Sequence, residues 1–169
     1  MGYEIVSIDE VGFQLVTNYK KIWFPKGETP KGAFFWSNKK ITTFGAQTSS
    51  HKFYYEFHNS QNSVTFIMFL NGLFDWLDMR KNYVFILDNA GWHKTKIVEK
   101  VIANHKNIKV EFIPPYSPEL NPIETNWKVT RNNVTKSQYF KSIEDLQKTL
   151  EKFWNKHIFM QNFTNYLCR

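Results

Sequence analysis

The stretch from Tyr83 to Trp127 constrains the fold more than any other part of the sequence. It opens with an apolar, β-branched and aromatic run, Tyr83–Leu87, which stops at Asp88. A helix-like segment follows, and a second apolar run, Ile108–Ile113, ends at two prolines. Short apolar runs that alternate with a helical segment predict parallel strands joined by right-handed crossovers. This stretch therefore predicts an α/β fold.

An acidic residue follows each of these two predicted strands. Asp88 comes directly after the first strand, and Glu124 lies in a predicted helix that begins after a proline-rich loop. Open α/β sheets bind their ligands at the carboxyl ends of parallel strands. If the two strands are neighbours, both acids face the same edge of the sheet and can hold a divalent metal ion.

The first sixty residues contain predicted strands and loops but no predicted helix. A first strand covers Tyr3–Ile8 and ends at Asp9, and a loop rich in Pro and Gly covers Trp23–Gly32. Several strands before any helix predict an antiparallel meander at the start of a mixed sheet. The other predicted strands are Phe13–Thr17, Ala33–Ser37, Ile41–Ala46 and Lys52–Phe57.

Four later segments have the apolar spacing of amphipathic helices. They are Ser63–Leu77, Lys94–Asn104, a helix from Asn121 to about Asn132, and a last helix that opens at Ser142. The residues predicted to face the core are Ile67, Leu70, Phe74 and Leu77 in the first helix, Ile97, Val98, Val101 and Ile102 in the second, and Ile143, Leu146, Leu150 and Phe153 in the last. Trp127 is also predicted to lie in the core rather than to stack on a nucleic-acid base.

Composition narrows the classes of protein that this chain can belong to. Its 169 residues are enough for one domain with a real core. The formal net charge of +7 suits a polyanion such as nucleic acid, although charge alone barely separates such a protein from other basic proteins. The single cysteine excludes an internal disulfide and fits a reducing compartment. No membrane span or secretory signal is recognisable, so we expect an intracellular protein, which in a prokaryote would lie in the cytoplasm or nucleoid.

Two motifs, LDNAGWHK and PPYSPELNPIE, resemble the catalytic core of D,D,E-type transposases in the insertion-sequence branch related to mariner. Thirty-five residues separate Asp88 from Glu124, close to the spacing in that family. Asp9, in YEIVSIDEVGF, matches the first acid of the family. The resemblance runs from Tyr3 to the helix that carries Glu124. It implies an α/β, RNase H-like mixed sheet flanked by helices, with antiparallel strands first and parallel strands later.

The resemblance also implies an activity and a metal cofactor. The activity is metal-dependent DNA cleavage and strand transfer at transposon ends, and the catalytic acids are Asp9, Asp88 and Glu124. Asp9 and Asp88 would flank two Mg²⁺ or Mn²⁺ ions, and Glu124 would complete one of the two sites. Two ions about 3.5–4 Å apart stabilise the attacking and leaving oxygens of a phosphodiester. Three acids without a Cys or His ligand cluster favour Mg²⁺ or Mn²⁺ over Zn²⁺.

Each acid also has a purely structural explanation. Asp88 begins an Asp-Asn pair, which starts turns well. Asp9 can be a surface acid at the end of a strand, and its neighbour Glu10 points to the opposite face if the strand is regular. Asn121 is a good helix N-cap, and Glu124 then occupies the position of the acid in a capping box. The three motifs, in the right order and at the right separations, favour the catalytic interpretation.

Four further residues are candidates near these acids. His93 matches a histidine of the family pattern and would approach the scissile phosphate or orient a water; alternatively, it caps the next helix. Lys128 and Arg131 follow Glu124 by four and seven residues, so all three share one helical face. These two bases, and Lys94, would bind DNA phosphates, or they belong to a solvated surface.

No helix-turn-helix region fits before Asp9, so the sequence predicts one RNase H-like catalytic domain over residues 1–169, either excised or from a truncated gene. The resemblance implies transposon-end and target DNA as partners, and a homodimer. Two other functions stay open. The chain is an inactive or domesticated remnant that binds DNA or a partner, or it is an RNase H-like nuclease that acts on hybrids or branched DNA.

Overall fold

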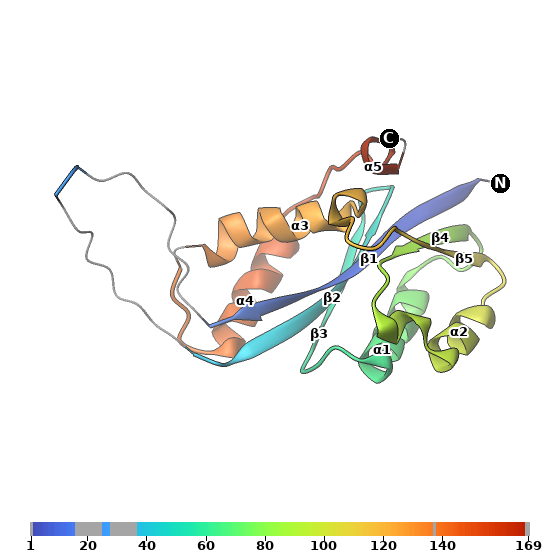
Figure 1. Ribbon diagram of the computed structural model, residues 1–169, viewed down its shortest axis with the longest axis horizontal. Coiled ribbons are helices and arrows are strands. Elements are labelled where there is room, and N and C mark those ends of the chain that lie inside the picture. The colour runs from blue at the N-terminus through green and yellow to red at the C-terminus, as the bar shows by residue number, and fades with distance from the viewer. Residues whose placement is uncertain (1, 16–24, 28–36, 137, 168–169) are drawn as a thin grey trace.

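The computed structural model describes residues 2–15, 25–27, 37–136 and 138–167. Five strands form one sheet in the order β3-β2-β1-β4-β5 (Figure 1). β2 pairs antiparallel with both β1 and β3, whereas β4 pairs parallel with both β1 and β5. The predicted mixed sheet is therefore confirmed, and the strands before Asp88 and before the proline pair are neighbours. The strands are β1 (Tyr3–Gln14), β2 (Lys40–Thr48), β3 (Phe53–His58), β4 (Asn82–Leu87) and β5 (Ile108–Phe112).

Helices cover both faces of this sheet. One pair packs on one face and a second pair on the other, so that the sheet is the middle of three layers (Figure 1). No helix among the described residues has the length and apolarity needed to cross a membrane. The first pair is α1 (Ser63–Trp76) and α2 (Lys96–Ala103), and the second is α3 (Ile123–Thr130) and α4 (Ile143–Trp154). The shorter elements are η1 (Gly91–Lys94), η2 (Pro118–Leu120), a π-helical turn η3 (Arg131–Thr135) and α5 (Thr164–Leu167).

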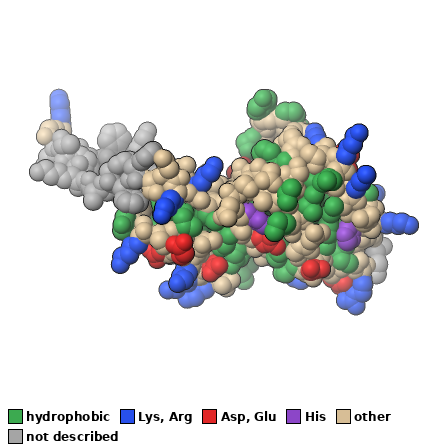
Figure 2. All heavy atoms as spheres, turned by 90° about the horizontal axis from the view of Figure 1, so that it is seen from below, with side chains coloured by type: hydrophobic (Ala, Val, Ile, Leu, Met, Phe, Trp, Pro, Cys, Tyr) green, Lys and Arg blue, Asp and Glu red, His purple; other side chains and the backbone are tan. Residues whose placement is uncertain are grey.

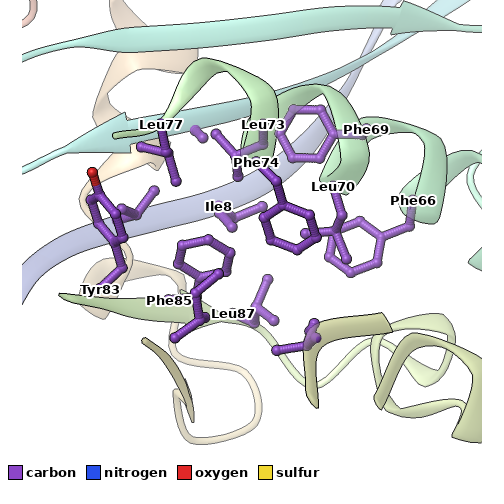
Figure 3. Close-up of a cluster of buried hydrophobic side chains, with 14 of the residues drawn as sticks. Ile8, Phe66, Phe69, Leu70, Leu73, Phe74, Leu77, Tyr83, Phe85 and Leu87 are labelled. Atoms are coloured by element: carbon purple, nitrogen blue, oxygen red, sulfur yellow. The ribbon is translucent and has the colours of Figure 1, made fainter. Parts of the chain in front are cut away.

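Alternation along β1 divides the core into two clusters. Val6 and Ile8 point toward α1 and α2, whereas Val11 and Phe13 point toward α3 and α4. In the first cluster, Ile8 and the side chains of β4 face a row of apolar residues on α1 (Figure 3). That row is Phe66, Phe69, Leu70, Leu73 and Phe74, and all five side chains are buried.

The prediction that the first strand ends at Asp9 is wrong. β1 continues without a break to Gln14, because its residues from Glu10 to Gln14 pair with Phe44 to Lys40 of β2. Phe13, expected to start a second strand, belongs to this same strand. Gln14 belongs to it as well, and only the last two residues of the predicted strand Phe13–Thr17 lie outside the described residues. Most of the predicted loop Trp23–Gly32 and of the predicted strand Ala33–Ser37 also lie outside them.

The predicted helices are present with shifted boundaries. The helix expected over Lys94–Asn104 is α2, which covers only Lys96–Ala103, because Lys94 ends the preceding 3₁₀ turn. Ile97, expected in the core, is 59% exposed. The helix expected from Asn121 begins at Ile123. At α4 the prediction holds, because the Ser142 side chain accepts a hydrogen bond from the backbone N–H of Asp145 and thereby caps the helix.

Candidate functional site

Strand register brings the first two candidate acids to the same level of the sheet. β1 and β4 are parallel, and Ser7 pairs with Ile86. Asp9 and Asp88 each lie two residues beyond this pair, so both stand at the same height, and alternation directs them to the same side as Ser7. The shared register of two parallel strands therefore brings two acids that are distant in sequence to the same end of the sheet.

All three candidate acids line one pocket of about 520 Å³, which we call the acid pocket. Asp9 comes from β1, Asp88 follows β4, and Glu124 lies in the first turn of α3. Its wall includes Asn89 and the proline-rich loop that joins β5 to α3. The three side chains therefore share one cavity and do not point into separate regions of solvent.

Asp9 is held from the α3 side of the sheet. Its side chain is only 8% exposed, and Oδ2 accepts a hydrogen bond of 2.9 Å from Nε1 of Trp127. Burial, together with repulsion from Glu10 and Glu124, holds the pKa of Asp9 well above its usual range. Burial therefore disfavours the ionised form of this carboxyl group.

Trp127 reaches Asp9 because the sheet leaves space for its ring. Gly45 on β2 pairs directly with Asp9, so a side chain at position 45 would project to the same face. A Cβ atom there would lie 2.8 Å from Cζ2 of the Trp127 ring, closer than real contacts allow. The indole therefore lies against the bare backbone of Gly45, which confirms Trp127 as a core residue and gives it a polar contact as well.

Asp88 is held differently, by two hydrogen-bond donors on one oxygen. Its Oδ1 accepts from the backbone N–H of Ala90 at 3.0 Å and lies 2.8 Å from Nδ1 of His93. The bond from His93 lowers the pKa of Asp88 most, and partial burial opposes it. The carboxylate remains 43% exposed toward the acid pocket, so it stays charged and accessible.

His93 lies between two carboxylates. Its Nε2 is 2.7 Å from Oε1 of Glu10, its side chain has no exposed surface, and Phe66 packs against the ring at 4.3 Å. Burial opposes the charged imidazolium, but the bonds to Asp88 and Glu10 outweigh it and raise the pKa of His93 to about 9. Neither role expected from the sequence fits, because both ring nitrogens are engaged and α2 begins after Thr95 without a side-chain cap.

Glu124 is positioned by a buried polar junction between β1 and α3. The Ser7 hydroxyl donates to Oδ1 of Asn121 and accepts from the backbone N–H of Ile123 at 3.1 Å. Asn121 is therefore turned into the protein, and no side chain caps α3. The capping-box explanation of Glu124 is wrong for this reason, since its side chain makes no bond to the start of the helix.

The electrostatics of Glu124 connect it to both neighbours. It is half-buried, and burial raises its pKa, as does repulsion from Asp88, whereas Arg131 acts in the opposite direction. Repulsion thus links Asp9 to Glu124 and Glu124 to Asp88. A divalent cation would relieve all of this repulsion, and three carboxylates form a donor set that suits Mg²⁺ or Mn²⁺. No three His, Cys, Asp or Glu residues in the described part of the chain already stand at metal-binding distances.

A second pocket, of about 670 Å³, adjoins the acid pocket, and we call it the basic groove. Both cavities share Pro118, Asn121 and Glu124 in their walls. The basic groove adds Lys128 and Arg131, as expected from their helical spacing, together with Lys136, Tyr166 and one further acid, Glu119. Charge therefore changes sign along one continuous depression, from acids at one end to bases at the other.

Lys94 lies outside both cavities. Its ammonium group contacts the Asn89 side chain and stands 4.6 Å above the ring of Phe112. It is close enough to Asp88 to help lower the pKa of that acid. On the face shown in Figure 2, Lys and Arg side chains are scattered around the outline and form no continuous patch. The basic groove is thus a more specific indication of anion binding than the net charge.

Two residues of the site, Glu10 and Gly45, were missed as functional candidates in the sequence. The sequence places Glu10 second to Asp9 because a regular strand directs it to the opposite face, and that same direction brings it to His93. An acidic residue in the middle of a buried strand indicates that a polar partner lies beside it, so the sequence did point to a contact of Glu10. For Gly45 no signal existed, because its contact with Trp127 depends on the packing of a helix on the sheet.

Comparisons with known proteins agree with this geometry. The model of a protein family described as "DDE superfamily endonuclease" matches residues 4–147. An uncharacterised protein y4pE/y4sA of Sinorhizobium fredii is 41% identical over 73 residues, which are 43% of this chain and 51% of that protein. The uncharacterised 39 kDa protein of insertion element IS630 of Shigella sonnei is 25% identical over 146 residues, 86% of this chain and 43% of that protein. The matches thus span about half the length of these relatives.

A solved structure shares the fold. The mariner Mos1 paired end complex with Mg superposes with a TM-score of 0.78 at 21% sequence identity. The match covers 97% of this chain and 52% of the Mos1 chain.

Proposed function

The chain belongs to the family of DDE superfamily endonucleases, and from this membership we propose that it is the catalytic region of a transposase that cleaves and transfers DNA strands at transposon ends. Its fold is RNase H-like, as in the Mos1 catalytic domain. One observation supports the proposal most: Asp9, Asp88 and Glu124, from three separate elements, line the same pocket.

The cofactor we propose is a pair of Mg²⁺ or Mn²⁺ ions. Mos1 paired end complexes were solved with Mg and with Mn. In this chain Asp9, Asp88 and Glu124 would hold the ions, which when bound activate the attacking hydroxyl and stabilise the leaving oxygen. The protein itself keeps Asp88 ionised through His93 and shields Asp9 from water under Trp127.

The substrate we propose is DNA whose scissile phosphate enters the acid pocket while the strand continues along the basic groove. Lys128 and Arg131 are placed to bind the next phosphates, because they line the groove beside Glu124. Lys94 would contact the strand on the Asp88 side. A relative in structure is a Mos1 complex with the left transposon end, and its paired ends motivate our further proposal of a homodimer acting inside the cell.

Replacement of Asp88 tests this function. Asp88→Asn keeps the shape of the side chain but removes its charge, so metal-dependent nicking of supercoiled plasmid DNA should fall by about 100-fold or more, since metal ions contribute several kcal/mol to such reactions. Asp78→Asn is the matched control, because Asp78 pairs with Arg80 on the surface and lies outside the acid pocket. Nicking by Asp88→Asn at the wild-type rate would show that the acid assignment is wrong.

The same assay separates the two other functions. An inactive remnant would bind plasmid or a partner but would not nick in Mg²⁺ or Mn²⁺ at any concentration. An RNase H-like nuclease would cleave an RNA–DNA hybrid in preference to duplex DNA. Strand joining to a second DNA molecule is the result that distinguishes a transposase from both.

A further inference from the structure

The two oxygens of the Asp88 carboxylate have different surroundings. Oδ1 is engaged by the His93 ring and by the backbone N–H of Ala90. The described residues give Oδ2 no hydrogen-bond partner, and the carboxylate lines the acid pocket. Because one oxygen is fixed by two donors, the direction of the other oxygen is fixed as well.

His93 can fix Asp88 only if the ring itself cannot move. Its second nitrogen, Nε2, is held at 2.7 Å by Oε1 of Glu10, a side chain that is 4% exposed. The same Glu10 oxygen accepts from Nε1 of Trp92 at 3.3 Å, and Phe66 covers the ring face. The imidazole is therefore held by its far nitrogen and by one of its faces.

Two adjacent residues of β1 point to opposite faces of the sheet. One is an acid of the pocket, and the other supports Asp88 through His93. Asp9 points toward α3 and into the acid pocket, whereas Glu10 points toward α1 and holds His93. Since both belong to one strand, any movement of β1 would displace Asp9 and the support of Asp88 together. This coupling keeps the two carboxylates in a constant relation.

We propose that Glu10 and His93 are positioning residues that direct the free oxygen of Asp88 toward a divalent cation in the acid pocket. The inference rests on the proposed metal-dependent function. Outer partners of this kind restrict the orientation of a metal ligand, and their loss typically weakens metal affinity by about 10–100-fold. Neither residue touches the metal or the DNA in this proposal.

Two substitutions of His93 separate the contact with Asp88 from the contact with Glu10. The amide nitrogen of Asn lies about where Nδ1 lies, so His93→Asn keeps a donor for Asp88. The amide nitrogen of Gln lies about where Nε2 lies, so His93→Gln keeps the contact with Glu10 and loses Asp88. Binding of Mn²⁺ alone, measured by calorimetry, should weaken about 10–100-fold in His93→Gln and less in His93→Asn.

A second pair of variants tests Glu10 in case His93→Gln does not fold. Glu10→Ala frees the ring and should weaken Mn²⁺ binding about tenfold, whereas Glu10→Gln keeps an acceptor oxygen and should restore most of the affinity. In plasmid nicking, the Mn²⁺ concentration for half-maximal rate should rise more than the maximal rate falls. His58→Gln is the control, because His58 pairs with Glu56 at 2.9 Å and touches no acid of the pocket.

The outcomes distinguish this inference from the proposed function. If the wild type binds no Mn²⁺, or if Asp88→Asn binds it equally well, the proposed function fails and the inference fails with it. If those two proteins behave as expected, but folded His93→Gln and Glu10→Ala bind Mn²⁺ as tightly as the wild type, only the positioning role is overturned. Circular dichroism identifies the folded variants.

Discussion

The two faces of the sheet hold their aspartates by different means. On the α3 side, Asp9 is buried and accepts from the neutral indole of Trp127. On the α1 side, the positively charged His93 bonds to Asp88 at the end of the sheet, and Asp88 remains partly exposed. The pKa of Asp9 is therefore raised and that of Asp88 lowered. The difference indicates that the surroundings of Asp88 favour its ionised form, whereas burial disfavours the ionised form of Asp9.

The largest expected effect follows from removing the negative charge of Asp9, on the α3 side of the sheet. Asp9→Asn should lower metal-dependent nicking by about 100-fold or more, because a proposed metal ligand is lost. The same variant should raise the melting temperature of the metal-free protein, since Asn keeps an acceptor for Trp127 without burying a charge. Activity and thermal denaturation measured on one preparation check both results. A lower melting temperature would show that Asp9 is stabilising as an anion.

The pH dependence of this stability difference has a definite sign. The folded-state pKa of Asp9 lies above the unfolded value near 3.8, so the folded protein binds the proton first as pH falls. The cost of the buried charge is present above the folded pKa and disappears below the unfolded one. Wild type and Asp9→Asn should therefore differ more at neutral pH than near pH 4, where they should converge.

Two glycine substitutions compare the packing of the two faces. Gly45→Ala pushes a methyl group into the buried Trp127 ring and should cost about 3 kcal/mol of unfolding free energy. Gly72→Ala, on α1, meets only the ends of the Tyr54 and Glu56 side chains, which can move away. The gain in helix propensity, about 1 kcal/mol, should offset that contact. Chemical denaturation of both variants checks the contrast, which fails if Gly72→Ala is the more damaging.

A smaller effect is expected when Trp127 is replaced by an aromatic residue without a hydrogen-bond donor. Trp127→Phe leaves the buried Asp9 without its hydrogen bond and should cost about 1–2 kcal/mol, within the range for an unpaired buried polar group. Mn²⁺ affinity should fall less than in His93→Gln, since Asp9 stays enclosed by the core whereas Asp88 keeps only the bond from the backbone N–H of Ala90. Equal losses in the two variants would mean that both faces anchor their acids with the same strength.

The sequence predicted most of the fold because its signals are local. The apolar run ending at Asp88, the run ending at the prolines and the face of α1 each lie within a few consecutive turns or strand residues. The predicted end of the first strand failed because Asp9, Glu10 and Gly12 interrupt the apolar pattern. β1 continues there because β2 supplies hydrogen bonds across this interruption.

The site was predicted less completely, for tertiary reasons. Asn121 has the local pattern of a helix cap, but the Ser7 hydroxyl, more than a hundred residues away, holds its side chain instead. His93 could be recognised as a site residue from its motif, but its two partners, Glu10 in β1 and Asp88 after β4, come from distant parts of the chain. The identities of the acids could be inferred from the motifs, whereas the contacts that orient them depend on strand register and helix packing.

The contact between Gly45 and Trp127 has a consequence for the evolution of this family. A relative that keeps tryptophan at the position of Trp127 can accept only glycine at the position of Gly45, because no other residue leaves the ring in place. A relative with a smaller side chain at the position of Trp127 is released from that restriction. Across an alignment of homologues the two columns should therefore covary, and sequences with a bulky residue at one and tryptophan at the other should be missing.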